Sequence, residues 1–124
     1  MKIELVKDAT AGGKKAAEYF LAAKQRGVKT FGLATGGTPV TTYAALVAGP
    51  IDFSDAVSLN LDEYVGLGAN DPQSYAAYMQ AHLFEKKPFA ASYLPNGLAS
   101  DPAAECARYD QLVAANPIGL QLLG

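Results

Sequence analysis

A pair of adjacent glycines between threonines is the first feature of this sequence that could do chemistry. The segment reads Thr35, Gly36, Gly37 and Thr38, and Pro39 follows at once. A strand that ends in such a turn and opens a helix presents several free backbone N–H groups at the positive end of the helix dipole. Glycines let an anion approach the backbone closely, and threonine hydroxyls add further donors. The turn therefore predicts a cradle for a phosphate or a carboxylate.

The spacing of the glycines narrows the ligand class. Only Gly36 and Gly37 are present, so the turn is not the dinucleotide pattern G-x-G-x-x-G. No G-K-[ST] follows, so it is not the phosphate loop of nucleoside triphosphatases either. A small phosphorylated metabolite fits better than a nucleotide. The alternative is a tight turn between a strand and a helix that needs glycine for its geometry alone, and the turn by itself does not decide between the two.

Two adjacent acids, Asp62 and Glu63, follow the alternating segment 57–61. In an open parallel sheet the carboxyl ends of all strands face the side where ligands bind, so Asp62 and the glycine turn are expected to share one crevice. A carboxylate partly shielded from water there has a raised pKa and can act as a general base. The alternative is an acid that caps the next turn or pairs with a lysine. A phosphate cradle with a base beside it suits proton abstraction next to a sugar-phosphate carbonyl.

The elements that would position these residues alternate along the chain. Apolar periodicity and turn residues predict strands at 2–7, 28–35, 57–65 and 118–124. Asp8, Thr38, Ser74 and Asp101 are predicted N-caps of the intervening helices, and 89–100 is predicted as a loop. The order β-α-β-α-β-α-α-β predicts an α/β fold with a parallel sheet flanked by helices. Because no helix follows the last strand to cover it, we expect the domain to be truncated at its carboxy-terminal side.

Composition excludes several classes of function. The chain has 124 residues, is half apolar and carries a formal charge of −2, which predicts one domain and no nucleic-acid partner. It has no apolar run long enough for a membrane span and no signal peptide. Cys106 is the only cysteine, which rules out an internal disulfide and favours a cytoplasmic location. No set of histidines and acids has metal-ligand spacing, so neither a metal nor a cofactor is expected.

Four stretches of the sequence together resemble the glucosamine-6-phosphate deaminase family. They are "GLATGGTPVTTYAAL", "LNLDEYVGL", "SYAAYM" and "AAECARYDQLV", and the likeness covers the whole chain. The resemblance implies a Rossmann-like sheet and the conversion of glucosamine 6-phosphate and water into fructose 6-phosphate and ammonia. It also implies amino-sugar metabolism without a metal or organic cofactor.

The same resemblance implies roles for particular residues. Residues 35–38 would hold the sugar phosphate, and Asp62 would move a proton between the first two sugar carbons. Glu63 and Tyr64 would complete the motif and support its geometry, and Tyr75 would line the substrate pocket. Oligomeric state varies within the family, so both a monomer and a homo-oligomer remain open.

The sequence also departs from the family pattern. The family's ring-opening histidine, in a G-H-I motif followed by N-E-P, comes just after the strand that 118–124 resembles, and it is absent here. The later basic residues of the phosphate site are absent too. We therefore expect residues 1–124 to be the amino-terminal part of a single α/β deaminase domain, inactive by itself.

Two other functions remain open. A 6-phosphogluconolactonase would share the architecture and a similar glycine turn, but its expected motif is D-E-R rather than the D-E-Y-V-G-L found here. A non-catalytic sugar-phosphate sensor should carry a DNA-binding helix-turn-helix before this domain, and the predicted strand that begins at Ile3 leaves no room for one.

Overall fold

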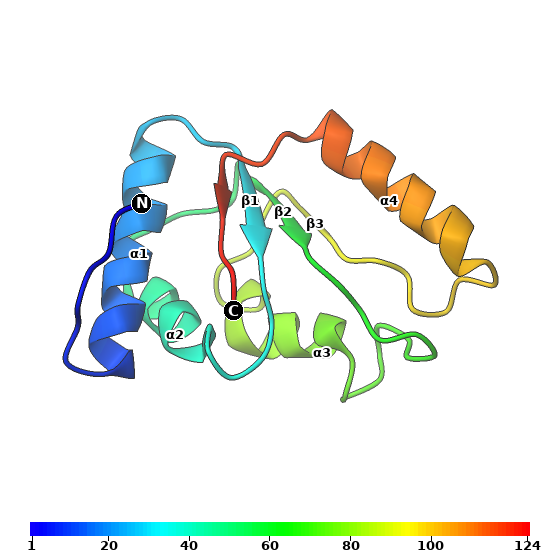
Figure 1. Ribbon diagram of the computed structural model, residues 1–124, viewed down its shortest axis with the longest axis horizontal. Helices are drawn as coiled ribbons and strands as arrows, with labels where there is room; N and C mark the ends of the chain where they lie inside the picture. Colours follow the sequence, from blue (N-terminus) through cyan, green and yellow to red (C-terminus); the bar gives the residue numbers. More distant parts are fainter.

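The computed structural model describes all residues 1–124, and its centre is a sheet of four parallel strands in the order β3-β2-β1-β4 (Figure 1). The predicted parallel sheet with flanking helices is confirmed. In chain order the elements are α1 (Ala9–Gln25), β1 (Thr30–Leu33), α2 (Val40–Ala48), β2 (Val57–Asn60), α3 (Tyr75–Met79) with the π-helical turn η1 (Gln80–Phe84), β3 (Ala91–Tyr93), α4 (Pro102–Ala115) and β4 (Leu120–Gln121).

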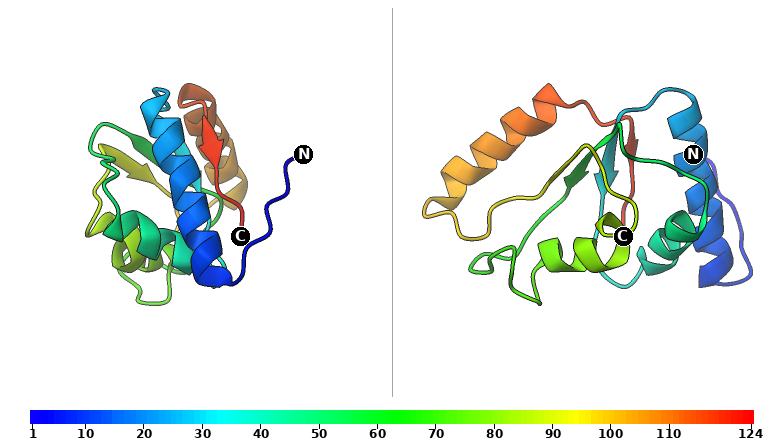
Figure 2. Two further views of the ribbon diagram at one scale, coloured as in Figure 1. Left: turned by 90° about the vertical axis from the view of Figure 1, so that its left-hand side faces the viewer. Right: turned by 180° about the vertical axis from the view of Figure 1, so that it is seen from behind.

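The helices lie on both sides of the sheet. Two views show α1 on one side and α4 on the other, while α2 and α3 lie near the carboxyl ends of the strands (Figures 1 and 2). Three of the predicted N-caps are made: Asp8, Ser74 and Asp101 accept hydrogen bonds from the backbone N–H three residues later, at 2.8, 3.0 and 3.1 Å. These side chains fix where α1, α3 and α4 begin, because each satisfies a donor that the helix cannot.

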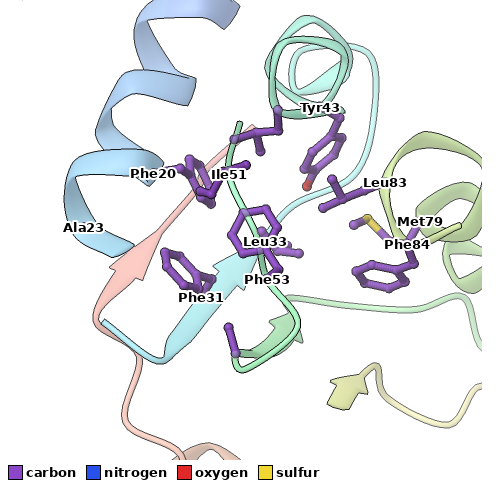
Figure 3. Close-up of a cluster of buried hydrophobic side chains, with 12 residues drawn as sticks. Phe20, Ala23, Phe31, Leu33, Tyr43, Ile51, Phe53, Met79, Leu83 and Phe84 are labelled. Carbon is purple, nitrogen blue, oxygen red and sulfur yellow. The ribbon is translucent and has the colours of Figure 1, made fainter. Parts of the chain in front are cut away.

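The hydrophobic core lies between the sheet and helices α1, α2 and α3 (Figure 3). Phe31 of β1 stacks on Phe20 of α1 with ring centroids 5.6 Å apart, and Phe53 meets both rings edge-on. Tyr43 of α2 and Met79 of α3 extend the same cluster. Burying each of these large side chains contributes about 1.5–3 kcal/mol, so the core fixes the strands from which the site residues emerge.

The predicted first strand, residues 2–7, is not formed. Residues 1–6 pair with no strand, and Ile3 and Leu5 are 75% and 96% exposed. The segment lies beside α1 instead (Figure 2), where Lys2 Nζ donates to the Tyr19 hydroxyl at 2.7 Å and this hydroxyl donates to Glu4 at 2.9 Å. Alternation favours a strand only where a neighbouring strand accepts its hydrogen bonds, and none lies beside this segment.

The predicted loop 89–100 contains a strand. Residues 91–93 form β3, which pairs in parallel with β2 through Val57 and Ala91 and through Leu59 and Tyr93. The helix predicted to follow Ser74 is regular only as far as Met79 and then widens into the π-helical turn.

No helix in the structure combines the length and the apolar character that crossing a membrane would require.

Candidate functional site

The glycine turn and Asp62 leave the sheet side by side. β1 and β2 are neighbours, and Leu33 is paired with Asn60 at their carboxyl ends. Thr35 and Asp62 each lie two residues beyond this pair. The Leu61 N–H donates to the Leu33 carbonyl at 3.2 Å, which keeps the two chains together past the strand ends. Paired strands are about 4.8 Å apart, so the two features predicted to share a crevice start at adjacent points.

The two glycines of the turn differ in what the chain requires of them. Gly36 has φ = +100°, a conformation that residues with a Cβ rarely adopt. Gly37 has no positive φ, and a Cβ added to it would meet no atom within 4 Å. Geometry alone therefore explains Gly36 but not Gly37. The N–H groups of residues 35–38 also make no hydrogen bond within the chain, so they are free to receive an acceptor from outside.

The prediction that Thr38 caps α2 is wrong. The helix begins at Val40, and Pro39 stands at the N-cap position with no side-chain capping bond. Because Pro39 follows the turn directly and is itself αR (φ −74°, ψ −10°), the chain turns helical without help from Thr38. The Thr38 side chain is exposed and its hydroxyl is not engaged.

The Asp62 carboxylate is exposed and makes no hydrogen bond or ion pair within the chain. It lines a pocket of about 220 Å³ together with Asn96, Glu105 and Cys106 from the side of α4. Residues 35–38 do not line this pocket. The partial shielding from water that a base at Asp62 is expected to have is therefore not supplied by these 124 residues, because no element of the chain closes over the carboxylate.

Glu63 caps the helix that follows. Its two carboxylate oxygens accept the N–H groups of Tyr75 and Ala76, at 2.8 and 3.0 Å, and one of them also accepts the N–H of Tyr64 at 2.9 Å. These donors belong to the first turn of α3, where a negative charge is favourable. Of the two adjacent acids, Glu63 is therefore the one that caps a helix, and Asp62 has no hydrogen-bond or ion-pair partner.

Tyr64 and Tyr75 form a pair on the same side of the molecule. Their ring centroids are 4.5 Å apart and their hydroxyl oxygens 3.2 Å apart. The hydrogen bond to Tyr75 raises the pKa of Tyr64 above its ordinary value. The pair lies at the start of α3, whose first residue is Tyr75.

Several polar features around the site are not predicted by the sequence. Tyr78 donates its hydroxyl to the Gly36 carbonyl at 2.6 Å, and Tyr43 donates to the Ala34 carbonyl. Asn60 and Ser58, the polar residues of β2, are 2% and 0% exposed, and their side chains have no hydrogen-bond partner. No sequence signal shows which carbonyls the hydroxyls of Tyr43 and Tyr78 reach.

No group of three or more histidine, cysteine, aspartate or glutamate side chains is placed so that it could hold a metal ion.

Known proteins are similar to this chain in sequence and in structure. No family model matches the sequence. The whole chain is 59% identical to a curated glucosamine-6-phosphate deaminase from Ligilactobacillus salivarius, of which it covers 53%. A solved structure of a monomeric glucosamine-6-phosphate deaminase superimposes with a TM-score of 0.87 at 36% identity, over 93% of this chain and 51% of the other.

More distant structures share the fold only. A 6-phosphogluconolactonase from Shewanella baltica superimposes with a TM-score of 0.75 at 15% identity, over 94% of this chain and 53% of the other. The chain spans about half the length of the curated relatives it matches. The resemblance to glucosamine-6-phosphate deaminases that the quoted motifs carry is thus confirmed over the whole of this chain.

Proposed function

We propose that this chain is the amino-terminal part of a single-domain glucosamine-6-phosphate deaminase, a hydrolase of amino-sugar metabolism. It supplies the phosphate-binding turn and the base that transfers the proton. One observation carries the proposal. The N–H groups of the glycine turn and the Asp62 carboxylate lack hydrogen-bond partners within the chain, and the turn and Asp62 begin at adjacent points at the carboxyl end of the sheet. The identity of 48–59% with curated deaminases over the whole chain supports it.

In this proposal residues 35–38 bind the phosphate of the sugar. Their N–H groups are free, and the open space at Gly37 lets phosphate oxygens approach the backbone. α2 begins one residue after the turn, at Val40, so the positive end of its dipole lies close to the same anion. Tyr64 and Tyr75 line the substrate side of the crevice, and Glu63 holds the start of α3 in place.

Asp62 is the proposed base. Its carboxylate takes the proton from the second carbon of the open-chain sugar and returns it to the first, which turns the 2-amino aldehyde into a 2-imine with no net oxidation or reduction. Water then adds to the imine carbon and ammonia leaves, which gives the ketose. Asp62 is exposed, so in this proposal the residues that shield it and those that open the sugar ring come from outside these 124 residues.

We further propose a cytoplasmic location, because the free Cys106 thiol is exposed and persists best in a reducing compartment. The related structure of similar fold is described as monomeric, and we propose a monomer here as well. Size-exclusion chromatography with light scattering at several concentrations checks the second point.

The experiment that tests the function joins residues 1–124 to the remaining half of the Ligilactobacillus salivarius relative and measures ammonia release from glucosamine 6-phosphate. The chimera should release ammonia, and its Asp62→Asn variant should lose at least about a thousandfold in kcat while binding the substrate nearly as well. Residues 1–124 alone should bind but not turn over. A folded chimera without activity, or an Asp62→Asn chimera with full activity, would refute the proposal.

The same assay separates the rivals. Hydrolysis of 6-phosphogluconolactone without ammonia release would identify a lactonase, and binding of hexose phosphates without turnover in the chimera would identify a sensor. No observation in the structure favours either one.

A further inference from the structure

Two tyrosines hold the glycine turn by its carbonyl groups. Tyr43, from α2, donates its hydroxyl to the Ala34 carbonyl, and Tyr78, from α3, donates to the Gly36 carbonyl at 2.6 Å. The two rings also meet nearly edge-on, with centroids 6.3 Å apart. Hydrogen bonds from α2 and α3 thus hold two peptide groups of the turn, the one after Ala34 and the one after Gly36.

A fixed carbonyl fixes the direction of the N–H in the same peptide. Every peptide bond in the chain is trans, so each C=O and the N–H of the next residue point in opposite directions. The Ala34 carbonyl shares its peptide with the Thr35 N–H, and the Gly36 carbonyl shares its peptide with the Gly37 N–H. With both carbonyls directed at α2 and α3, these two N–H groups must point away from the helices. Both lack a partner within the chain.

The tyrosine hydroxyls are themselves well fixed. Tyr43 is 0% exposed in the core, and the Tyr78 ring lies against His82 with centroids 4.3 Å apart. Burial raises the pKa of both tyrosines above the ordinary value, so both hydroxyls stay protonated and remain donors at neutral pH. Neither hydroxyl needs to reorient when an anion arrives.

The hydrogen bond from Tyr78 also connects the turn to the pair of acids. Glu63, directly after Asp62, binds the first N–H groups of α3, and α3 carries Tyr78 to the Gly36 carbonyl. A single short helix therefore spans from the residue beside the proposed base to the proposed phosphate turn. The relative position of the two depends on α3.

We infer that Tyr43 and Tyr78 are positioning residues, which aim the Thr35 and Gly37 N–H groups at the phosphate of the substrate by holding the carbonyls on the opposite side of the same peptides. The inference rests on the proposed function, since it presumes that an anion binds the turn. Neither tyrosine touches the anion itself.

Tyr78→Phe is the direct test, because it removes one hydroxyl from a half-buried ring and leaves the packing in place. Inorganic phosphate and glucosamine 6-phosphate are titrated separately into the ¹⁵N-labelled 124-residue chain, and amide shifts are followed. In the unsubstituted chain the Thr35 and Gly37 amides should shift with both anions. Tyr78→Phe should weaken both affinities about tenfold and reduce the Gly37 shift most, with the urea midpoint lowered only slightly. Tyr19→Phe, which also loses a hydroxyl hydrogen bond but at an exposed residue bonded to the amino-terminal segment, should bind like the unsubstituted chain.

The outcomes separate the two proposals. If Tyr78→Phe binds both anions with unchanged affinity and the same amides shift, the positioning role is refuted and the phosphate turn stands. If the unsubstituted chain shows no shift at residues 35–38 with either anion, the phosphate turn of the proposed function is refuted, and the positioning role with it. If Tyr78→Phe loses affinity only in proportion to a general loss of folded protein, the role is structural and the inference is also refuted. Tyr43→Phe provides a second variant, for which a larger weakening centred on the Thr35 amide is expected.

Discussion

At the scale of single residues, the two glycines of the turn should respond differently to the same substitution. Gly36→Ala places a Cβ on a residue with φ = +100° and should lower the free energy of unfolding by about 1–2 kcal/mol. Gly37→Ala should change it by less than about 0.5 kcal/mol, because the added Cβ meets nothing. The same Cβ occupies the space that a phosphate would enter, so phosphate affinity should fall about tenfold or more, by at least about 1.4 kcal/mol. Urea denaturation and phosphate titration measure the two effects.

Equal losses of stability in both variants would show that both glycines serve the geometry of the turn. Equal phosphate affinity in Gly37→Ala and the unsubstituted chain would show that no anion approaches the backbone there. Either result would leave the simple turn as the better explanation of the motif.

Only the site residues that directly follow a strand could be placed from the sequence. Parallel strands end on the same side, so the turn and Asp62 could be placed together from their positions in the chain. The contact of Tyr78 with Gly36 could not, because it joins residues 42 positions apart and depends on how α3 packs. The sequence indicates that one of the two acids could cap a turn, but only the course of the chain between residues 63 and 75 assigns this role to Glu63.

At the scale of elements, Glu63 should stabilise the start of α3. Glu63→Ala removes the acceptor for the N–H groups of Tyr75 and Ala76 and should cost about 1 kcal/mol in the free energy of unfolding. Glu63→Gln keeps one oxygen acceptor and should cost less. Glu18→Ala is the matched control, because Glu18 makes only an exposed ion pair with Lys15 at 3.0 Å. A midpoint of urea unfolding that is the same for Glu63→Ala and Glu18→Ala would contradict the capping role.

A second element, α4, has one buried side chain that connects it to the sheet. Tyr109 is its only buried residue, and its hydroxyl donates to the carbonyls of Asn60 and Tyr93 at 2.7 and 3.0 Å. Tyr109→Phe should therefore weaken the attachment of α4 by about 1 kcal/mol. Amide hydrogen exchange in α4 should become roughly fivefold faster, with α1 amides as the internal reference. Unchanged exchange in α4 would show that other contacts hold the helix.

The elements that the sequence predicted correctly are those with their own local signals. Asp8, Ser74 and Asp101 cap helices where N-cap residues precede apolar periodicity. Residues 2–7 have the alternation of a strand but no neighbouring strand here, and β3 has a neighbour but only three residues. Strand formation depends on a partner that is distant in sequence, and local patterns do not contain that information.

At the scale of the whole molecule, stability should fall steeply at alkaline pH because buried tyrosines cannot ionise. Burial raises the pKa of Tyr109 to about 12 and that of Tyr43 further, whereas in the unfolded chain both ionise near 10. Below pH 10 both states keep the protons, and the contribution to stability is fully present. Between pH 10 and 12 only the unfolded state loses them, so each buried tyrosine lowers the free energy of unfolding by up to about 1.4 kcal/mol per pH unit.

Urea unfolding at intervals from pH 8 to pH 11.5 measures this slope. Tyr43→Phe removes one group that the folded state keeps protonated, so the variant should start less stable at pH 8 and lose stability more slowly above pH 10. Tyr19→Phe, at a residue that is 41% exposed, is the control for a general effect of replacing tyrosine by phenylalanine. A slope unaffected by Tyr43→Phe would mean that the Tyr43 hydroxyl reaches water in the folded chain. The hydrogen bond from Tyr43 to the Ala34 carbonyl, one of the two that hold the turn, would then not persist in solution.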